Sequence, residues 1–487
     1  MSKFPISPLS CFIFTTSLAL LSTATIAQTP KPLPIPSLNQ NNVVVDQTEL
    51  NHSPIKTQLE YAAPCEAISP ESKLLTQLQK QIEINPSKNK EILDKFWAKI
   101  DKSGTPIIET LNDQQSRIIF LWKGAKHNVR LIGGPSNDHE WLTRMPKSDV
   151  WFKESIIDNR YIGSYSFAVD LPNLEGYLSN YCPHLNPNLK ESRSQRRTVI
   201  QVQRIDPFNN NAYLAKNNNS GLRNENLVAL KLAPKFINPK KYPDVAQPSL
   251  IKHQLESKLL NNVRTISIYQ SKAKLNQDYI TAIFFDGQHY NELLNVPKAL
   301  DILVEQGKLP PIQAIFVSPP NEQIRPKELT PNKEFSAFFN QELMPWIKKN
   351  APQTVNANKT VLLGSSLGGL SSAYLALENP NMISHVVPLS GSFWWQAENS
   401  DLPNGMSKII REKNLHSPQH WFITANSYET SRNNNELSIL ETSPVVAEDL
   451  IQKGHDVTYK SYIGGHSYAV WQVAVQDALQ HFFSKSL

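Results

Sequence analysis

The stretch VLLGSSLGGLSSAYLAL, residues 361–377, decides the fold of this chain. It begins with an apolar run of the kind that forms a buried strand, and it ends with apolar residues at helical spacing. Between them, Gly364 to Gly368 matches G-x-S-x-G, in which the central serine stands on a sharp turn from strand to helix. The stretch therefore predicts a strand, a tight turn and a helix, with a serine at the turn.

Ser366 is the central serine of this motif and the candidate nucleophile. Its hydroxyl would project at the N-terminus of the helix, where the helix dipole and the free N–H of Leu367 stabilise a developing oxyanion. Ser365 takes the variable position and would point elsewhere. The alternative is a turn of small residues that only lets the strand and the helix pack. The strand before and the helix after favour the nucleophile.

Four further segments of the C-terminal half are continuous apolar strands, and helical segments separate them. They are TAIFFDG (281–287), QAIFVSP (313–319), HVVPLSG (385–391) and HWFITAN (420–426). This alternation is typical of a parallel sheet that helices cover on both faces. We therefore predict an α/β fold class, with an α/β-hydrolase domain over residues 259–487.

In this fold the acid and then the histidine follow the nucleophile along the chain. His466 lies in a glycine-led loop after an apolar strand and before a helix, which is where the catalytic histidine is expected. Glu429 stands just beyond a preceding strand, where a carboxylate can hold the imidazole in its working tautomer. A surface role for Glu429 stays open. His455 is the competing histidine, and Asp449 and Asp456 are alternative acids.

An oxyanion hole needs a second donor, which comes from the loop after an earlier strand. Asp286, Gly287 and Gln288 stand directly after the apolar run AIFF. One of these backbone N–H groups, with Gly287 and Gln288 as the candidates, should pair with that of Leu367. At such a site Ser366 attacks an ester carbonyl, a histidine takes the proton, the alcohol leaves and water releases the acyl group.

The first half of the chain has a different rhythm. Residues 28–72 are rich in Pro, Asn and Gln and are predicted to be a flexible segment. A helical pattern follows, interrupted at Pro86, and from about Gly104 the apolar residues alternate with a period of two. This alternation predicts the short strands of a small β-sandwich. We place the helices and the sandwich in residues 73–205 and a connector rich in Asn and Pro in residues 206–258.

Residues 1–27 have the layout of a secretory signal, with a lysine near the start, an apolar stretch and small residues before Gln28. Cleavage after Ala27 or Ala24 would place the mature chain in the periplasm or outside the cell. A retained N-terminal anchor is the alternative. The apolar stretch is short for a bilayer span, and no other stretch is long enough. We therefore predict no stable membrane insertion after cleavage.

Composition limits the remaining possibilities. A length of 487 residues favours two domains, and 40% hydrophobic with 19% charged residues is typical of a globular protein. The net charge of +6 is spread along the chain, so no basic stripe predicts nucleic-acid binding. Cys65 and Cys182 can form one disulfide bridge or remain two thiols. No Cys/His cluster has metal-ligand spacing, so neither a metal nor a cofactor is expected.

Several of these segments together resemble the enterochelin (enterobactin) esterase family. They are FFDGQHY (284–290), IRPKEL (324–329), GSSLGGLSSAYLAL (364–377), PLSGSFWW (388–395), NSYET (426–430) and YIGGHSYAVWQ (462–472), and upstream RIIFLWKG (117–124), SDVWFKESI (148–156) and DPFNNNAY (206–213). The resemblance implies an immunoglobulin-like N-terminal domain before the α/β-hydrolase domain. It also implies a serine esterase that cleaves the trilactone of a catecholate siderophore, a small-molecule substrate with or without its iron.

The resemblance also suggests which residues contact this substrate, because the ferric complex is anionic and aromatic. Arg325 can offer planar hydrogen bonds and charge, and Trp394 and Trp395 can offer flat surfaces to catechol rings. Asp286 is assigned to the same substrate site. Core packing is the alternative for the two tryptophans, and an ion pair with a carboxylate such as Glu328 is the alternative for Arg325.

Two features depart from the family pattern. Family members often carry Asp directly after the catalytic histidine, whereas Ser467 stands here, which leaves Glu429 or a Ser–His dyad to orient the base. A signal peptide together with the N-terminal domain is also unusual. The alternative function is a secreted carboxylesterase of the feruloyl or acetyl esterase type. A siderophore-binding protein with a decayed site and a lipid or mycolyl transferase are further alternatives.

Overall fold

The computed structural model of the chain describes residues 68–135, 140–172, 198–199, 201–213, 225–272, 278–396, 405–413, 417–430 and 437–484. The predicted signal sequence, Cys65 and Cys182 lie outside these ranges. None of the helices within them combines the length and the apolar character that a membrane span requires. The same ranges contain no cluster of His, Cys, Asp and Glu side chains that could hold a metal ion.

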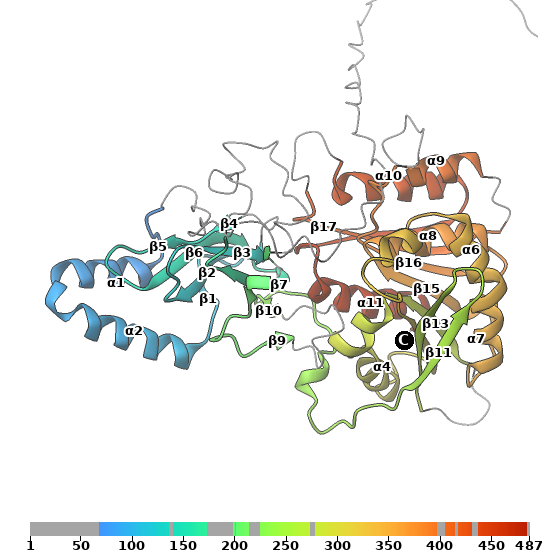
Figure 1. Ribbon diagram of the computed structural model, residues 1–487, viewed down its shortest axis with the longest axis horizontal. Coiled ribbons are helices and arrows are strands. Elements are labelled where there is room, and N and C mark those ends of the chain that lie inside the picture. Colours follow the sequence, from blue (N-terminus) through green and yellow to red (C-terminus); the bar gives the residue numbers. More distant parts are fainter. Residues whose placement is uncertain are drawn as a thin grey trace, which may run out of the picture. The chain divides into compact units, whose positions relative to one another are not determined.

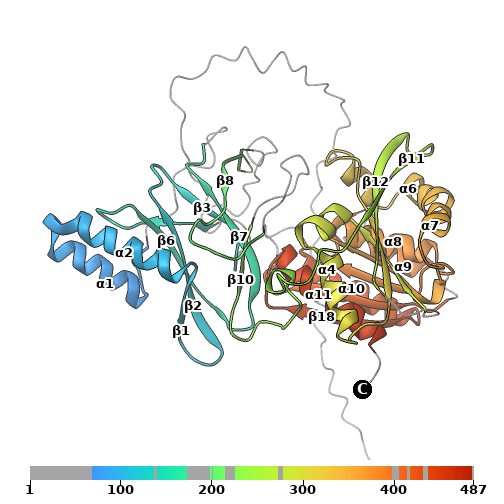
Figure 2. The same ribbon diagram turned by 90° about the horizontal axis from the view of Figure 1, so that it is seen from below.

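Two helices precede the sandwich, with a break at Pro86. The elements are α1 (Lys73–Ile84), the short helix η2 (Pro86–Lys88) and α2 (Asn89–Ser103). The two long helices lie side by side (Figure 2). Ser72 caps α1 by accepting the N–H of Leu75 at 3.2 Å. One face of each helix is buried in a cluster that includes Trp97 of α2 and Phe152 of the sandwich, so the helices depend on the sandwich for burial of their apolar faces.

The sandwich consists of two sheets that pack around an aromatic core. One sheet has the order β1-β2-β6-β5, and the other has the order β4-β3-β7-β10-β9 with β8 paired to β7. The strands are β1 (Ile107–Thr110), β2 (Gln115–Lys123), β3 (Val129–Gly133), β4 (Glu140–Trp141), β5 (Thr143–Arg144), β6 (Val150–Asp158), β7 (Ile162–Val169), β8 (Gln203–Arg204), β9 (Ala212–Tyr213) and β10 (Glu225–Ala229). Phe120 and Tyr165, one from each sheet, meet edge to face at 4.9 Å. The predicted β-sandwich is confirmed in outline (Figure 1).

The predicted connector, residues 206–258, is more structured than expected. Its strand β10 pairs with β7 and β9 inside the sandwich, and its last residues form β11 (Ile251–Ser257) at the edge of the large sheet. The asparagines that suggested a loop have a structural role. Asn226 accepts the backbone N–H of Asp206 at 2.6 Å within the buried sheet. The sandwich therefore extends beyond residue 205, because the edge of β7 pairs with this later segment.

The C-terminal half is built on an eight-stranded sheet with the order β11-β12-β14-β13-β15-β16-β17-β18 among the described residues. Its remaining strands are β12 (Asn262–Gln270), β13 (Ile280–Phe285), β14 (Ile312–Val317), β15 (Thr360–Ser365), β16 (His385–Leu389), β17 (His420–Asn426) and β18 (Asp456–Tyr462). The first two strands are antiparallel to their neighbours, and the pairs from β14 to β18 are parallel. The central strands are buried throughout, which explains their continuous apolar runs.

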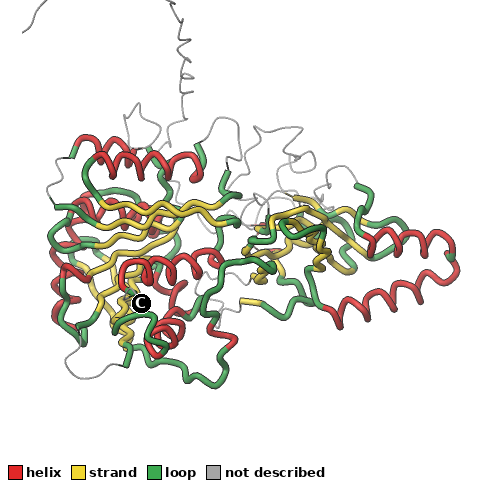
Figure 3. The backbone as a smooth tube through the Cα atoms, turned by 180° about the vertical axis from the view of Figure 1, so that it is seen from behind, coloured by secondary structure: helices red, strands yellow, loops and turns green. Residues whose placement is uncertain are grey.

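Helices cover both faces of this sheet (Figure 3). The apolar cluster on one face contains α4 (Val296–Glu305) and α11 (Tyr468–Phe483). The cluster on the other face contains α6 (Lys333–Phe338), α7 (Met344–Asn350), α8 (Leu367–Glu378), α9 (Gly405–Glu412) and α10 (Ile439–Gln452). The predicted α/β-hydrolase fold is confirmed, and the carboxyl ends of its parallel strands meet at one edge, where such folds bind ligands.

Candidate active site

The serine motif forms the strained turn that the sequence predicts. Between β15 and α8, Ser366 has φ 57° and ψ −121°, in the positive-φ region that residues other than glycine rarely adopt. Its N–H donates to the carbonyl oxygen of Leu389 on β16 at 3.0 Å, which holds this backbone in place. Gly364 leaves room for the turn, since a Cβ there would lie 2.3 Å from the carbonyl oxygen of Gly368. The turn presents Ser366 at the start of α8.

His466 and Glu429 lie together at the same edge of the sheet. Nδ1 of His466 is 2.7 Å from Oε1 of Glu429, and Oε2 of Glu429 accepts the N–H of Asn426 at 2.7 Å. The glutamate side chain is 1% exposed and the imidazole 37% exposed. A carboxylate can only accept at Nδ1, so that nitrogen carries the proton and Nε2 keeps its lone pair. This is the tautomer that a general base requires.

A buried hydrogen-bond network supports the loop that carries His466. Asn426 donates through Nδ2 to the Gly465 carbonyl oxygen and to Ser390 Oγ, both at 3.1 Å. Trp471 donates from Nε1 to the same Ser390 Oγ at 2.9 Å, and its ring meets the imidazole edge to face at 4.8 Å. The sequence analysis missed this role, although Ser390, Asn426 and Trp471 lie in segments that carry the family resemblance, because residue type alone does not show which distant groups hydrogen-bond to each other.

The two predicted sides of the oxyanion hole begin at neighbouring strands. Leu367 is the first residue of α8, and the N–H of a first helical residue has no partner within its helix. On the other side, Gly287 follows β13, and a Cβ there would lie 2.5 Å from the backbone carbon of Phe316. Gln288 follows and precedes the π-helical turn η5 (His289–Leu293). Donation from these amides to substrate stays a prediction.

Asp286 and Arg325 form a two-point ion pair beside this loop. Nε and Nη2 of Arg325, at the start of α5 (Arg325–Leu329), donate to the two carboxylate oxygens at 2.7 and 2.6 Å. The Asp286 side chain is fully buried, whereas that of Arg325 is 18% exposed. Burial disfavours the charge of Arg325, but the neighbouring carboxylate outweighs burial and raises the pKa of the guanidinium. Glu328, the alternative partner from the sequence, pairs with Arg264 instead.

Ser366 and His466 line one cavity of about 250 Å³. The other lining residues are Glu225, His289, Leu293, Glu322, Arg325, Ser365, Ser467, Tyr468 and Trp471. A nucleophile, a base and a guanidinium thus face the same space. Tyr468 hydrogen-bonds to His289 Nδ1 at 2.5 Å, and burial together with the nearby Asp286 carboxylate raises the pKa of its phenol, so the Tyr468 hydroxyl stays protonated at neutral pH.

Trp394 and Trp395 do not belong to the lining of this cavity. Trp394 is 48% exposed. Trp395 is partly buried against the apolar cluster that contains α8 and α9. Its ring occupies the space that a Cβ on Gly405 would need. This position of Trp395 agrees with the core-packing alternative. Trp394 has an exposed ring, and its binding to a catechol stays a prediction.

Comparisons with known proteins bear on both halves of the chain. The family model described as "Enterochelin esterase, N-terminal" matches residues 117–237, and the one described as "Putative esterase" matches residues 257–482. The chain is thus similar to enterochelin esterases in both halves, and it is a carboxylic ester hydrolase.

Curated relatives and solved structures of the enterochelin esterase family cover most of the chain. The iron(III) enterobactin esterase of Yersinia enterocolitica is 26% identical over 66% of this chain and 92% of the relative. The enzyme of the same name from Dickeya dadantii is 24% identical over 79% of this chain and 92% of that relative. The enterobactin esterase from Shigella flexneri, solved in the presence of enterobactin, superposes with a TM-score of 0.64 at 22% identity, over 80% of this chain and 97% of that one. The two structures share a fold.

The competing residues of this esterase are engaged elsewhere. His455 accepts the backbone N–H of Gln419 at 3.0 Å through Nδ1. Asp449 pairs with Arg411 at 2.8 Å, and Asp456 pairs with His420 at 2.8 Å. None of the three lines the cavity. Among the described residues, Glu429 is the candidate acid that hydrogen-bonds to His466.

Proposed function

We propose that this esterase hydrolyses the ester bonds of a catecholate siderophore, such as the trilactone of ferric enterobactin, and thereby assists iron release or siderophore processing. The observation that carries the proposal is a serine, a histidine–carboxylate pair and a guanidinium around one cavity, on a chain whose two halves both match this family. Relatives named as iron(III) enterobactin esterases support the substrate class.

The geometry supports a two-step acyl transfer. His466 Nε2 takes the proton of Ser366 as Oγ attacks an ester carbonyl, and Glu429 stabilises the imidazolium that forms. In this mechanism the N–H of Leu367 and one N–H of the loop 286–288 would hold the oxyanion. His466 then returns the proton to the departing serine hydroxyl of the substrate. A water molecule activated by the same histidine releases the acyl group and restores Ser366.

The cavity offers both charge and flat apolar surface. Arg325 brings a guanidinium to its wall, and Trp471 and Tyr468 bring aromatic rings. Catechol rings pack on aromatic faces, and planar oxygen pairs match a guanidinium. The carboxylates of Glu225 and Glu322 also line the wall and can accept hydrogen bonds from protonated catechols. The cavity therefore has partners for both parts of the proposed substrate.

The proposed substrate is tested by a panel of esters with product masses. We expect the purified chain to release 2,3-dihydroxybenzoylserine units from enterobactin, offered with and without iron, faster than it releases ferulate from methyl ferulate. Mass spectrometry of timed samples gives the products and their order. Failure on both forms of the trilactone, together with good turnover of methyl ferulate, would instead support the secreted carboxylesterase of the feruloyl or acetyl type.

We also propose that residues 1–27 direct export, so that the esterase acts in the periplasm or outside the cell. The support is the order of a basic start, an apolar stretch and small residues before Gln28. After expression of the full chain in a Gram-negative host, the intact mass of the exported protein should correspond to a start at residue 25 or 28. An uncleaved chain that stays in the cytoplasm would contradict this.

A further inference from the structure

The Asp286 carboxylate lies at an unusual point of the backbone. Asp286 directly follows β13 and has φ 54°, a left-handed conformation that residues with a side chain seldom adopt. The next residue, Gly287, lies against the backbone of Phe316 on β14 so closely that no side chain fits. The loop 286–288 is thus held in a strained conformation, and surrounding contacts must maintain it.

The same carboxylate contacts the other side of the predicted oxyanion hole. A Cβ on Gly368, the second residue of α8, would lie 3.1 Å from Oδ2 of Asp286. The carboxylate therefore packs directly against the first turn of the helix that carries Leu367. Both of its oxygens accept from Arg325 at 2.7 and 2.6 Å. A shift of Asp286 would move the loop 286–288 relative to α8 and so change the spacing of the donors.

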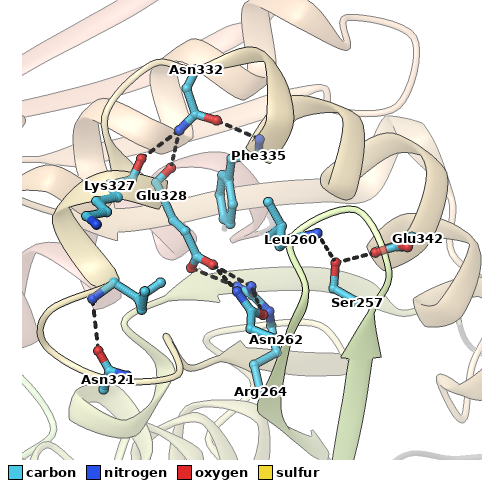
Figure 4. A network of polar contacts seen from close by, with 11 residues as sticks. Ser257, Leu260, Asn262, Arg264, Asn321, Lys327, Glu328, Asn332, Phe335 and Glu342 are labelled. Atoms are coloured by element: carbon cyan, nitrogen blue, oxygen red, sulfur yellow. Dashed lines mark hydrogen bonds and ion pairs between the residues drawn. The ribbon is translucent and has the colours of Figure 1, made fainter.

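Arg325 is itself supported by a second buried ion pair. Glu328, on the same short helix α5, accepts from Arg264 of β12 at 2.7 and 3.1 Å and from Asn262 at 2.9 Å (Figure 4). The Arg264 guanidinium lies 4.2 Å from the centre of the Phe338 ring. Asn332 donates to the Glu328 carbonyl oxygen at 3.3 Å. Since five residues form no stable helix alone, these contacts fix α5 and with it the start of the Arg325 side chain.

We propose that Arg325 is a positioning residue, which holds the oxyanion-hole loop through Asp286 in addition to facing the cavity. Two N–H donors on one edge of the guanidinium, those of Nε and Nη2, point at the two carboxylate oxygens of Asp286. Their bidentate geometry fixes the orientation of Asp286 as well as its charge. The role belongs to the esterase site itself, so it rests on the esterase activity and not on the identity of the siderophore.

This role differs in its kinetic consequence from simple substrate binding. An arginine that only attracts an anionic substrate contributes equally to the ground state and the transition state, so its loss raises KM. An arginine that maintains the donors of an oxyanion hole acts on charge that develops in the transition state, so its loss lowers kcat. A neutral ester with no group for a guanidinium to bind separates the two roles.

The test compares p-nitrophenyl acetate and enterobactin as substrates of four proteins. These are the wild type, Arg325→Ala, Arg325→Lys and Asp286→Asn. On p-nitrophenyl acetate we expect Arg325→Ala and Asp286→Asn each to lower kcat about 100-fold with little change in KM, as for loss of one oxyanion donor. Arg325→Lys should be intermediate, because an ammonium cannot reproduce the paired hydrogen bonds. Added guanidinium chloride should restore part of the activity of Arg325→Ala.

Controls separate a positioning role from loss of folding. Lys327→Ala, an exposed position on the same helix, should match the wild type. The double variant Asp286→Asn/Arg325→Gln leaves no charge buried without a partner and should lose no more activity than either single variant, because the pair acts as a unit.

Unchanged p-nitrophenyl acetate kinetics in folded Arg325→Ala, with only KM for enterobactin raised, would overturn the proposal. A wild type that turns over only p-nitrophenyl acetate would contradict the siderophore substrate and leave this test intact.

Discussion

Ser366→Ala is expected to lower kcat for every ester by at least about 10⁴-fold, because it removes the hydroxyl that stands on the strained turn at the start of α8 and that we assign as the nucleophile. Among the described residues its hydroxyl hydrogen-bonds to Ser392 Oγ at 3.3 Å, and loss of this one long contact should cost little stability. Assays of enterobactin and p-nitrophenyl acetate hydrolysis measure kcat for the wild type and for Ser366→Ala. Thermal unfolding followed by far-UV circular dichroism compares their stability.

The matched control for this prediction is Ser371→Ala, a buried serine one turn further along α8. It should keep wild-type activity. His466→Ala should lose about as much as Ser366→Ala, and the double variant should lose no more than either, since nucleophile and base act as one unit. Loss of activity in Ser365→Ala with retention in Ser366→Ala would move the nucleophile to the neighbouring serine.

The sequence was sufficient to predict the fold of the C-terminal half, because its apolar residues follow the spacing of buried strands and of helices. The apolar runs of β13 to β17 are continuous because those strands are buried on both faces, and the chain order of an α/β-hydrolase then limits where an acid and a histidine can stand. The structure places Glu429 at 2.7 Å from His466 without any motif linking them. Strand order made that glutamate the first candidate and left Asp449 and Asp456 as alternatives.

Long-range side-chain contacts were not visible in the sequence. Arg325 and Asp286 are 39 positions apart, and the helix α5 that carries Arg325 also carries Glu328, which forms the buried pair with Arg264. A guanidinium bonded to a buried carboxylate and one open to a substrate have the same sequence signature. Trp395 shows the same ambiguity, since a ring packed on Gly405 and a ring open to catechols differ only in their neighbours. Such roles follow from tertiary packing, which local patterns do not encode.

The connector is a further case in which composition misled. Asn and Pro are enriched in loops because asparagine bonds local backbone groups and proline lacks an N–H. Here Asn226 sits in β10, is fully buried and accepts a backbone N–H from Asp206. An asparagine that satisfies backbone groups inside a sheet has the same composition signal as one in a turn, so the extent of the sandwich had to come from its strand pairing.

Glu429→Gln is expected to lower kcat by about 10³- to 10⁴-fold, and the reason lies in which atoms can donate. In the wild type one carboxylate oxygen accepts the Asn426 N–H and the other accepts from His466 Nδ1, each at 2.7 Å. A glutamine has one oxygen and one NH₂ group. The backbone N–H can only donate, so the amide oxygen must face Asn426 and the NH₂ must face the imidazole. His466 then carries its proton on Nε2 and cannot accept one from Ser366.

Asp449→Asn supplies the matched control, because Asp449 is also a buried carboxylate in an ion pair, with Arg411 at 2.8 Å, and does not line the cavity. It should change kcat by less than about threefold, as should Asp456→Asn. Kinetics with enterobactin and p-nitrophenyl acetate, measured on folded variants, decide among the three acids. A tenfold loss or less in Glu429→Gln would indicate a Ser–His dyad. A large loss confined to Asp449→Asn or Asp456→Asn would transfer the orienting role to that carboxylate, which the 2.7 Å contact between Glu429 and His466 makes physically unfavourable.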